Sequence, residues 1–338
     1  MIQKAAYILL GITALLIIAF WLQPLKKGEG SDRKTKYQLV HGWPALPSFI
    51  KLGSPTGIDL DSNQQVVVLN RANRKWPLVG PMPKDRIKQN TVFFIDKDNG
   101  QLLHSWGNNL FIMPHGLTVD HENNIWITDV GLHQVFKFNK AGKLLLQLGE
   151  AGVAGSDRIH FDMPTGVATA DDGTFYVSDG YGNSRIMKFS ADGKYLSEWG
   201  KKADKAGEFN IPHGIALDHN GFVYVADREN NRIQIFSATG GFIKQLSGNW
   251  GAINSVAFDP SGLRWIASDD ISFLKIWHRG SDILVFDTVG NVQTRIGRSG
   301  FYNGPATWLH DLATDKDGNI YAGDIRGNTI QKFKKMKE

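Results

Sequence analysis

The stretch LFIMPHGLTVDHENNIWITDVGLHQVFKF, residues 110–138, decides the fold. It contains three short apolar runs with polar turns between them, and the second and third runs cover residues 125–127 and 135–138. Short runs of this kind, bounded by Gly, Asn and Asp, are typical of antiparallel strands. The stretch therefore predicts a three-stranded β meander that begins at Pro114-His115-Gly116.

The same unit recurs along the chain as Pro-x-Gly, an apolar run ending in Asp, a turn, a second apolar run ending in Asp, and a strand ending in Phe. The six copies, of which the fifth is degenerate, begin at Pro55, Pro114, Pro164, Pro212, Ile253 and Leu309. Apolar runs such as 144–148 and 195–199 lie between copies and supply a fourth strand. Six four-stranded units predict an all-β fold, a six-bladed β-propeller over residues 38–338.

The sixth copy has only three strands before the chain ends at Glu338. An uncovered strand edge promotes aggregation, so another segment must pair with it. The segment 37–40, ahead of the first copy, is the expected donor and would close the ring. Residues 23–37 are otherwise polar and basic, and we interpret them as a linker.

Composition excludes several classes of function. The 338 residues contain no cysteine, which excludes disulfides and thiolate metal sites. Of the net charge of +5, +4 lies in residues 1–36. A nearly neutral propeller offers no basic surface for nucleic acid, so no nucleic-acid partner is expected.

The N-terminal segment predicts a membrane anchor. Residues 5–22 carry no charge and are long enough to span a bilayer as a helix. No small-residue cleavage site follows, which favours an uncleaved signal anchor at 1–22, a transmembrane helix, over a cleaved signal peptide. Lys26 and Lys27 oppose export under the positive-inside rule. The short N-terminus is nevertheless the usual export arrangement, so we expect a membrane-anchored chain with its propeller on the extracytoplasmic side.

Histidines occupy one repeat position in alternate copies. They are His115, His213 and His310, which are 98 and 97 residues apart, and the other copies have Thr56, Thr165 and Asn254 there. First strands line the channel of a propeller and alternate blades are about 120° apart, so the three imidazoles should converge at one mouth. Three histidines without a fourth protein ligand are the open arrangement of a catalytic zinc site. The alternative is three unrelated histidines.

The sixth copy differs in a second way, because Asp311 follows its histidine where the other copies have Gly or Ser. A carboxylate in the channel beside a zinc site needs a partner. Calcium would suit, with backbone carbonyls completing an oxygen shell. An aspartate that is hydrogen-bonded to turn amides is the alternative.

The loops after the second strands should open on the same mouth. They contain Arg71, Tyr181, Arg228 and Arg326. A phenol near zinc suits general acid or base catalysis, and two arginines suit a carboxylate, although each arginine would also fit a surface salt bridge. An insertion at 72–90, which contains Trp76, is either a lid over the mouth or a solvated loop.

With these residues the chain resembles the peptidyl-α-hydroxyglycine α-amidating lyase (peptidylamidoglycolate lyase) family of NHL-repeat six-bladed propellers. The resemblance covers nearly all of 42–334 and is closest in 110–138, 177–189 and 225–230. It implies that His115, His213 and His310 hold a catalytic zinc ion. It implies that Tyr181 is the catalytic base and that Arg71 and Arg228 lie in the active site. It also implies a structural calcium at Asp311 and at the main-chain carbonyls of Ile58 and Leu117.

The reaction that the resemblance implies is cleavage of the C–N bond of a peptidyl-α-hydroxyglycine to an amide and glyoxylate. The expected partner is therefore a small-molecule or peptide substrate with a hydroxyglycine-like end. The chain departs from the family at Trp308 and Leu309, where Met and Pro are usual, and it lacks the cysteines of the animal enzymes.

Two other classes of function remain open. One is a non-catalytic NHL-repeat propeller that binds protein or peptide, which the histidines in alternate copies disfavour. The other is a calcium-dependent lactonase-type propeller hydrolase, which would have an acidic, Asn-rich mouth in place of histidines.

Overall fold

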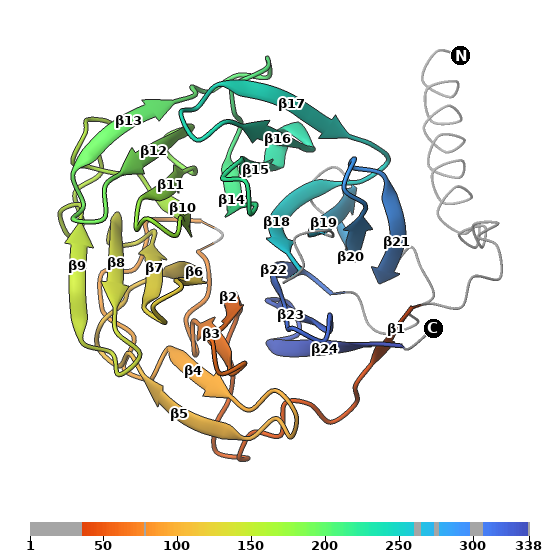
Figure 1. The fold of residues 1–338 in the computed structure, drawn as a ribbon. Helices are drawn as coiled ribbons and strands as arrows, with labels where there is room; N and C mark the ends of the chain where they lie inside the picture. The colour runs from red at the N-terminus through yellow and green to blue at the C-terminus, as the bar shows by residue number, and fades with distance from the viewer. Residues whose placement is uncertain (1–35, 78, 260–264, 274–276, 298–306, 337–338) are drawn as a thin grey trace, which may run out of the picture. The chain divides into compact units, whose positions relative to one another are not determined.

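The computed structural model describes residues 36–77, 79–259, 265–273, 277–297 and 307–336. Within these ranges the chain forms 24 β-strands and one three-residue 3-10 helix, η1 (Arg228–Asn230). The strands form six four-stranded antiparallel sheets, which are arranged as blades around a common centre (Figure 1). The prediction of an all-β propeller is confirmed.

In five of the blades, the strands follow one another in chain order from the innermost to the outermost strand. The first contains β2 (Pro55–Leu60), β3 (Val66–Asn70), β4 (Val92–Ile95) and β5 (Leu102–Trp106). The second contains β6 (Pro114–Val119), β7 (Ile125–Asp129), β8 (Gln134–Phe138) and β9 (Leu144–Leu148). The third contains β10 (Pro164–Thr169), β11 (Phe175–Asp179), β12 (Arg185–Phe189) and β13 (Tyr195–Trp199). The fourth contains β14 (Pro212–Leu217), β15 (Val223–Asp227), β16 (Arg232–Phe236) and β17 (Phe242–Ser247). The fifth contains β18 (Ala252–Phe258), β19 (Trp265–Phe273), β20 (Trp277–Phe286) and β21 (Val292–Gly297).

The sixth blade joins the two ends of the propeller. It contains β22 (Leu309–Thr314), β23 (Ile320–Asp324), β24 (Thr329–Lys335) and β1 (Tyr37–Leu39). The first strand in the chain, β1, pairs with β24, with Leu39 opposite Phe333. This pairing covers the edge of β24 and closes the ring as the sequence predicted.

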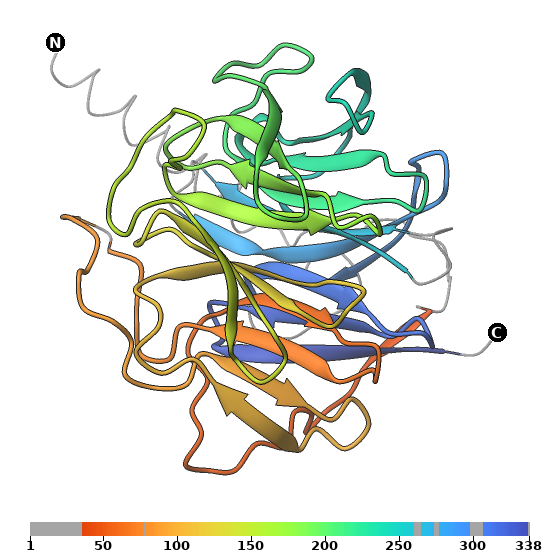
Figure 2. The same ribbon diagram turned by 60° about the vertical axis from the view of Figure 1, so that its left-hand side comes forward.

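Buried apolar side chains fill the spaces between blades. Val67, Leu69, Phe94, Phe111 and Phe136 belong to one cluster that joins the first and second blades. The outermost strands face solvent, as the exposed leucines of β9 show. The turned view in Figure 2 shows that neighbouring blades lie face to face. Close packing of this kind transmits strain, so the inner strands form a rigid frame for the channel.

An aspartate at the end of the second strand fixes the loop that enters the first strand. Asp129 on β7 accepts hydrogen bonds from the N–H groups of Ile112 and Met113 at 2.8 and 3.0 Å. The corresponding bonds in two other blades run from the Asn210 N–H to Asp227 and from the Trp308 N–H to Asp324. Each of these carboxylates is buried. The repeated Asp therefore positions each of the three strands that carry a histidine at their second residue.

The predicted N-terminal transmembrane helix and the membrane-anchored, extracytoplasmic location need correction. A bilayer-spanning helix requires about 20 apolar residues. In the part of the chain that the structure describes, no helix has the length and apolar character to cross a membrane. The segment on which the prediction was based, 1–22, lies outside the described residues, as does most of the predicted linker at 23–37.

Candidate metal centre

The three histidines converge at one end of the central channel. His115, His213 and His310 are the second residues of β6, β14 and β22, and all three are buried. Their ring centroids are 4.7, 4.7 and 4.8 Å apart. Their candidate ligand atoms all lie within 4.8 Å of one another, the one such group of His, Asp or Glu found in the described residues. The arrangement matches the expectation from alternate repeats.

Each imidazole is held by the backbone of the neighbouring blade. The Nδ1 atoms of His115, His213 and His310 lie 2.8, 2.7 and 2.7 Å from the carbonyl oxygens of Thr165, Asn254 and Thr56. Because a carbonyl only accepts, Nδ1 carries the proton and Nε2 keeps its lone pair. A metal-ligating histidine is typically oriented by such a bond. From the sequence, these three residues were identified only as the ones that stand at the histidine position in the other copies.

The imidazoles are neutral at physiological pH. Burial lowers the pKa of His115 and His213 well below the usual value, and the positive charge of a protonated His310 would lower both further. Burial and the Arg71 guanidinium lower the pKa of His310 to about 3. Neutral imidazole is the form that binds a metal.

Tyr181 lies where the Nε2 atoms converge. Its hydroxyl oxygen is 3.2 Å from Nε2 of His115 and 3.2 Å from Nε2 of His213. The same oxygen accepts a hydrogen bond from Nη1 of Arg228 at 3.3 Å. The Tyr181 N–H donates to the Met163 carbonyl at 3.3 Å and fixes the loop that follows β11. The phenol is therefore placed to exchange a proton with a group bound at the histidines.

Two arginines face the same point. Arg71 is only 4% exposed, its Nε donates to the Pro114 carbonyl at 2.9 Å, and its Nη2 has no hydrogen-bond partner. Burial lowers the pKa of Arg71 to about 10, so it stays cationic at neutral pH. Nε of Arg228 makes no hydrogen bond, but it lies 3.6 Å from a carboxylate oxygen of Glu229, so Arg228 is also part of a salt bridge. A buried cation with a free N–H is suited to a carboxylate ligand, and Arg71 is not the surface salt bridge of the alternative interpretation.

Arg326 does not join this group. Its side chain is exposed on the loop after β23. Its backbone N–H donates to Asp324 at 3.1 Å. Of the four residues expected at the mouth, the structure brings Arg71, Tyr181 and Arg228 together.

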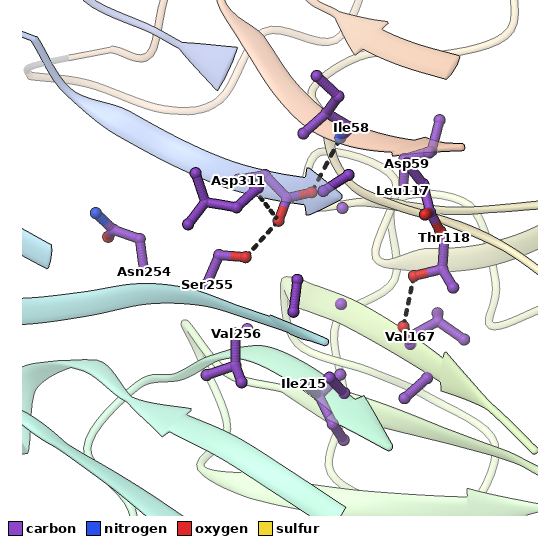
Figure 3. Close-up of a pocket in the computed structure, with 18 of the residues that line it drawn as sticks. Ile58, Asp59, Leu117, Thr118, Val167, Ile215, Asn254, Ser255, Val256 and Asp311 are labelled. Carbon is purple, nitrogen blue, oxygen red and sulfur yellow. Dashed lines mark hydrogen bonds between the residues drawn. The ribbon is translucent and has the colours of Figure 1, made fainter. Parts of the chain in front are cut away.

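Asp311 lines the channel one residue beyond His310 (Figure 3). One carboxylate oxygen accepts from the Ile58 N–H at 3.0 Å, and the other from the Ser255 hydroxyl at 2.5 Å and the Leu312 N–H at 3.0 Å. Burial raises the pKa of Asp311 to about 7. These bonds agree with the hydrogen-bonded aspartate of the alternative interpretation, and a carboxylate oxygen keeps further lone pairs for a cation.

A second carboxylate in the channel, Asp59, was missed by the sequence reasoning. Asp59 also lines the cavity (Figure 3). Its carboxylate oxygens accept from the N–H groups of Leu60 and Val119, both at 2.8 Å. Burial raises the pKa of Asp59 to about 6. The signal was present in the repeats, because Thr118 and Ala168 occupy this position in the next two copies.

The cavity suits a hard cation. Asp59 and Asp311 line it together with Ile58 and Leu117, and its described lining includes neither Lys nor Arg. The Ile58 N–H points at Asp311. Because the N–H and C=O of a strand residue point to the same edge, the Ile58 carbonyl also faces the channel. Two carboxylates and a carbonyl are ligands that calcium accepts.

This chain is similar to known proteins both in its repeats and in its fold. The NHL repeat model matches residues 111–138, 161–189 and 209–236, within the second, third and fourth blades. A solved structure described as "Streptogramin B lyase structure" is 16% identical, with a TM-score of 0.57 over 84% of this chain and 94% of that one. At that identity the likeness shows the propeller fold alone.

Curated relatives are more similar in sequence. "Peptidyl-alpha-hydroxyglycine alpha-amidating lyase 1" of Drosophila melanogaster is 34% identical over 348 residues, covering 93% of this chain and 63% of the relative. "Peptidyl-glycine alpha-amidating monooxygenase B" of Xenopus laevis is 35% identical over 341 residues, covering 93% of this chain and 38% of the relative. The chain thus spans less than two thirds of the length of both.

Proposed function

We propose that this chain, which belongs by homology to the NHL-repeat peptidyl-α-hydroxyglycine α-amidating lyases, is itself a zinc-dependent lyase. Its reaction would cleave the C–N bond of a peptidyl-α-hydroxyglycine and release a peptide amide and glyoxylate. The observation that supports the proposal most is the Tyr181 hydroxyl, 3.2 Å from Nε2 of both His115 and His213. A proton-transfer group at a three-histidine centre is what this reaction needs.

Substrate binding would use the two arginines and the histidines. The free Nη2 of Arg71 and Nη1 of Arg228 would bind the substrate carboxylate, which brings the adjacent hydroxyl to the histidines. Nε2 of His115, His213 and His310 would hold zinc, and zinc, when bound, makes a hydroxyl easier to deprotonate. Their fixed tautomer and burial fit this role, because Nδ1 is held by a carbonyl in each and the candidate ligand atoms lie within 4.8 Å of one another.

Tyr181 would carry the proton. In its phenolate form it accepts the proton of the substrate hydroxyl, and the C–O bond becomes the C=O of glyoxylate. The electron pair of the breaking C–N bond passes to the amide nitrogen, which takes the proton back from Tyr181. One proton moves from oxygen to nitrogen, so no water or oxidant is consumed. The Arg228 hydrogen bond to the phenol oxygen would hold the side chain in place during both transfers.

We also propose a structural calcium at Asp311, with the carbonyls of Ile58 and Leu117. The support for it is the pair of channel carboxylates, Asp59 and Asp311, in a cavity whose described lining includes neither Lys nor Arg. A bound cation would neutralise this charge.

One experiment tests the lyase proposal. Purified protein is loaded with zinc, its zinc content is measured, and glyoxylate release is followed with a benzoyl-capped α-hydroxyglycine. We expect one zinc per chain and release of glyoxylate, and loss of both in His213→Ala. Arg326→Ala, which changes an exposed arginine outside the site, should keep both. Bound zinc without glyoxylate release would refute the lyase and leave only the metal centre.

The other two classes of function fit the geometry less well. A non-catalytic propeller that binds protein or peptide gives no reason for a buried Arg71 with an unpaired Nη2 beside three histidines. A lactonase-type site needs acidic and amide ligands at the mouth, where this chain has imidazoles.

A further inference from the structure

The insertion between β3 and β4 is fixed over the metal centre. Nη1 and Nη2 of Arg74 bind the two carboxylate oxygens of Asp85 at 3.1 and 2.9 Å, across the insertion. The Ile87 N–H donates to the Phe111 carbonyl at 2.8 Å, and the Asn109 N–H donates to the Ile87 carbonyl at 2.8 Å. Ile87 is buried. The insertion is thus attached to the loop that leads into β6, and of the two interpretations offered for it, a cover over the mouth is the better.

Trp76 connects this insertion to the catalytic candidates. Its ring centroid lies 5.1 Å from that of Tyr181, with an angle of 41° between the ring planes. The Arg71 guanidinium carbon lies 5.3 Å from the same Trp76 ring. Both Trp76 and Tyr181 pack against the core cluster between the first two blades. One indole therefore contacts a proposed base and a proposed carboxylate ligand.

The Trp76 contact becomes more important once the histidines hold zinc. The Tyr181 hydroxyl now uses Nε2 of His115 and His213, and those lone pairs are the ones that zinc would take. The phenol oxygen would keep the 3.3 Å bond from Arg228. Its ring would keep edge contacts with the two imidazoles, at centroid distances of 5.3 and 5.8 Å, and the contact with Trp76.

We propose that Trp76 is a positioning residue, which holds the Tyr181 phenol and the Arg71 guanidinium in place beside the metal centre. The inference rests on the proposed lyase function and extends it to a residue that does not touch the reacting atoms. Misplacement of a catalytic group by about 1 Å costs up to about 10²-fold in rate. Loss of the indole face should therefore lower kcat more than it raises KM.

The test compares three variants of the zinc-loaded protein. Trp76→Phe keeps an aromatic face, Trp76→Leu keeps apolar volume without one, and Lys75→Ala changes an exposed neighbour as the control. We expect Trp76→Leu to lower kcat about tenfold. KM should change less than about threefold, because Arg71 Nε keeps its bond to the Pro114 carbonyl at 2.9 Å. Trp76→Phe should restore most of the rate, and Lys75→Ala should match the parent. Zinc content and melting temperature confirm folding, and Trp76→Met replaces Trp76→Leu if the latter does not fold.

A crystallographic readout separates this inference from the lyase proposal. In zinc-loaded Trp76→Leu the Tyr181 side chain should leave its place or adopt several conformers, while in Trp76→Phe it should stay. If the parent protein releases no glyoxylate, the lyase proposal fails, yet these structures still test the role of Trp76. An unmoved Tyr181 and an unchanged kcat in Trp76→Leu would overturn the inference. An equal loss of rate in Trp76→Phe and Trp76→Leu would overturn it as well.

Discussion

Replacing Tyr181 by Phe removes one oxygen from the site and is the sharpest test of its chemistry. That oxygen touches Nε2 of His115, Nε2 of His213 and Nη1 of Arg228. Among the described residues no other side chain is hydrogen-bonded to either Nε2, so no other group there is placed to take over the proton transfer. Positioned acids and bases contribute about 10²–10⁴-fold to rate. We expect kcat to fall about 10³-fold, equivalent to about 4 kcal/mol in the barrier.

The rest of the site should survive this substitution. Phe keeps the ring that packs on Trp76 and against the edge of His115. The imidazoles keep their carbonyl partners on Thr165, Asn254 and Thr56. Zinc content should therefore remain at one per chain, and KM should change less than about threefold because Arg71 and Arg228 still bind the carboxylate.

The assay follows glyoxylate release over a range of substrate concentrations, with zinc content measured on the same samples. A Tyr181→Phe enzyme with a kcat within tenfold of the parent would refute the assignment of Tyr181 as the proton-transfer group. Loss of zinc would also contradict the reasoning, because it would make the phenol oxygen a metal ligand and not a base.

Four further predictions follow from the same contacts. His213→Ala should reduce zinc content from one per chain to near zero, measured by metal analysis after dialysis. Arg71→Met should raise KM for a hydroxyglycine substrate by at least about tenfold, because a hydrogen bond to a charged group contributes about 1.5–3 kcal/mol, whereas Arg326→Ala should leave KM unchanged. Burial raises the folded-state pKa of Asp311 from 3.8 to about 7, so the folded protein binds a proton that the unfolded chain has lost. As the pH rises from about 4 to 7, the metal-free protein should therefore lose about 1 kcal/mol of unfolding free energy per pH unit. Thermal melts of Asp311→Asn should show a weaker dependence of stability on pH. Arg185→Ala should destabilise the propeller by about 3–5 kcal/mol in chemical denaturation while zinc is retained, because it leaves the buried Asp179 carboxylate without its cation.

Features that follow from the repeat were readable in the sequence. The spacing of the apolar runs and turns identified the blades, because each copy carries the same local signals. The convergence of the histidines followed from one fact, their shared repeat position in alternate copies. Pairing of β1 with β24 followed from the missing strand of the sixth copy.

Features that depend on contact between blades were not readable in the sequence. The carbonyl partners of the imidazoles come from other copies, and a backbone oxygen leaves no residue signature. Trp76 and Tyr181 follow strands of different blades, and their ring contact at 5.1 Å arises only when those blades pack. The uncharged segment 5–22 lies outside the described residues, so its hydropathy was the whole basis for the predicted transmembrane helix. No helix in the described part of the chain could cross a membrane.

The alternation around the ring explains why six blades produce one site with three ligands. Three imidazoles only 4.7–4.8 Å apart fill the channel at this level, so the intervening copies carry smaller side chains and contribute their carbonyls. The residue after the histidine must then be small. A Cβ on Gly116 would lie 2.4 Å from the Thr165 oxygen, and one on Gly214 would lie 2.7 Å from the Asn254 oxygen, in both cases the oxygen that binds the preceding imidazole.

The sixth blade breaks this rule at Asp311, and the consequence is local. Its carboxylate points across the channel to the Ile58 N–H and the Ser255 hydroxyl, on the two adjacent blades. His310 nevertheless keeps its bond to the Thr56 carbonyl at 2.7 Å. The same strand, β22, therefore supplies an imidazole to the mouth and a carboxylate to the channel.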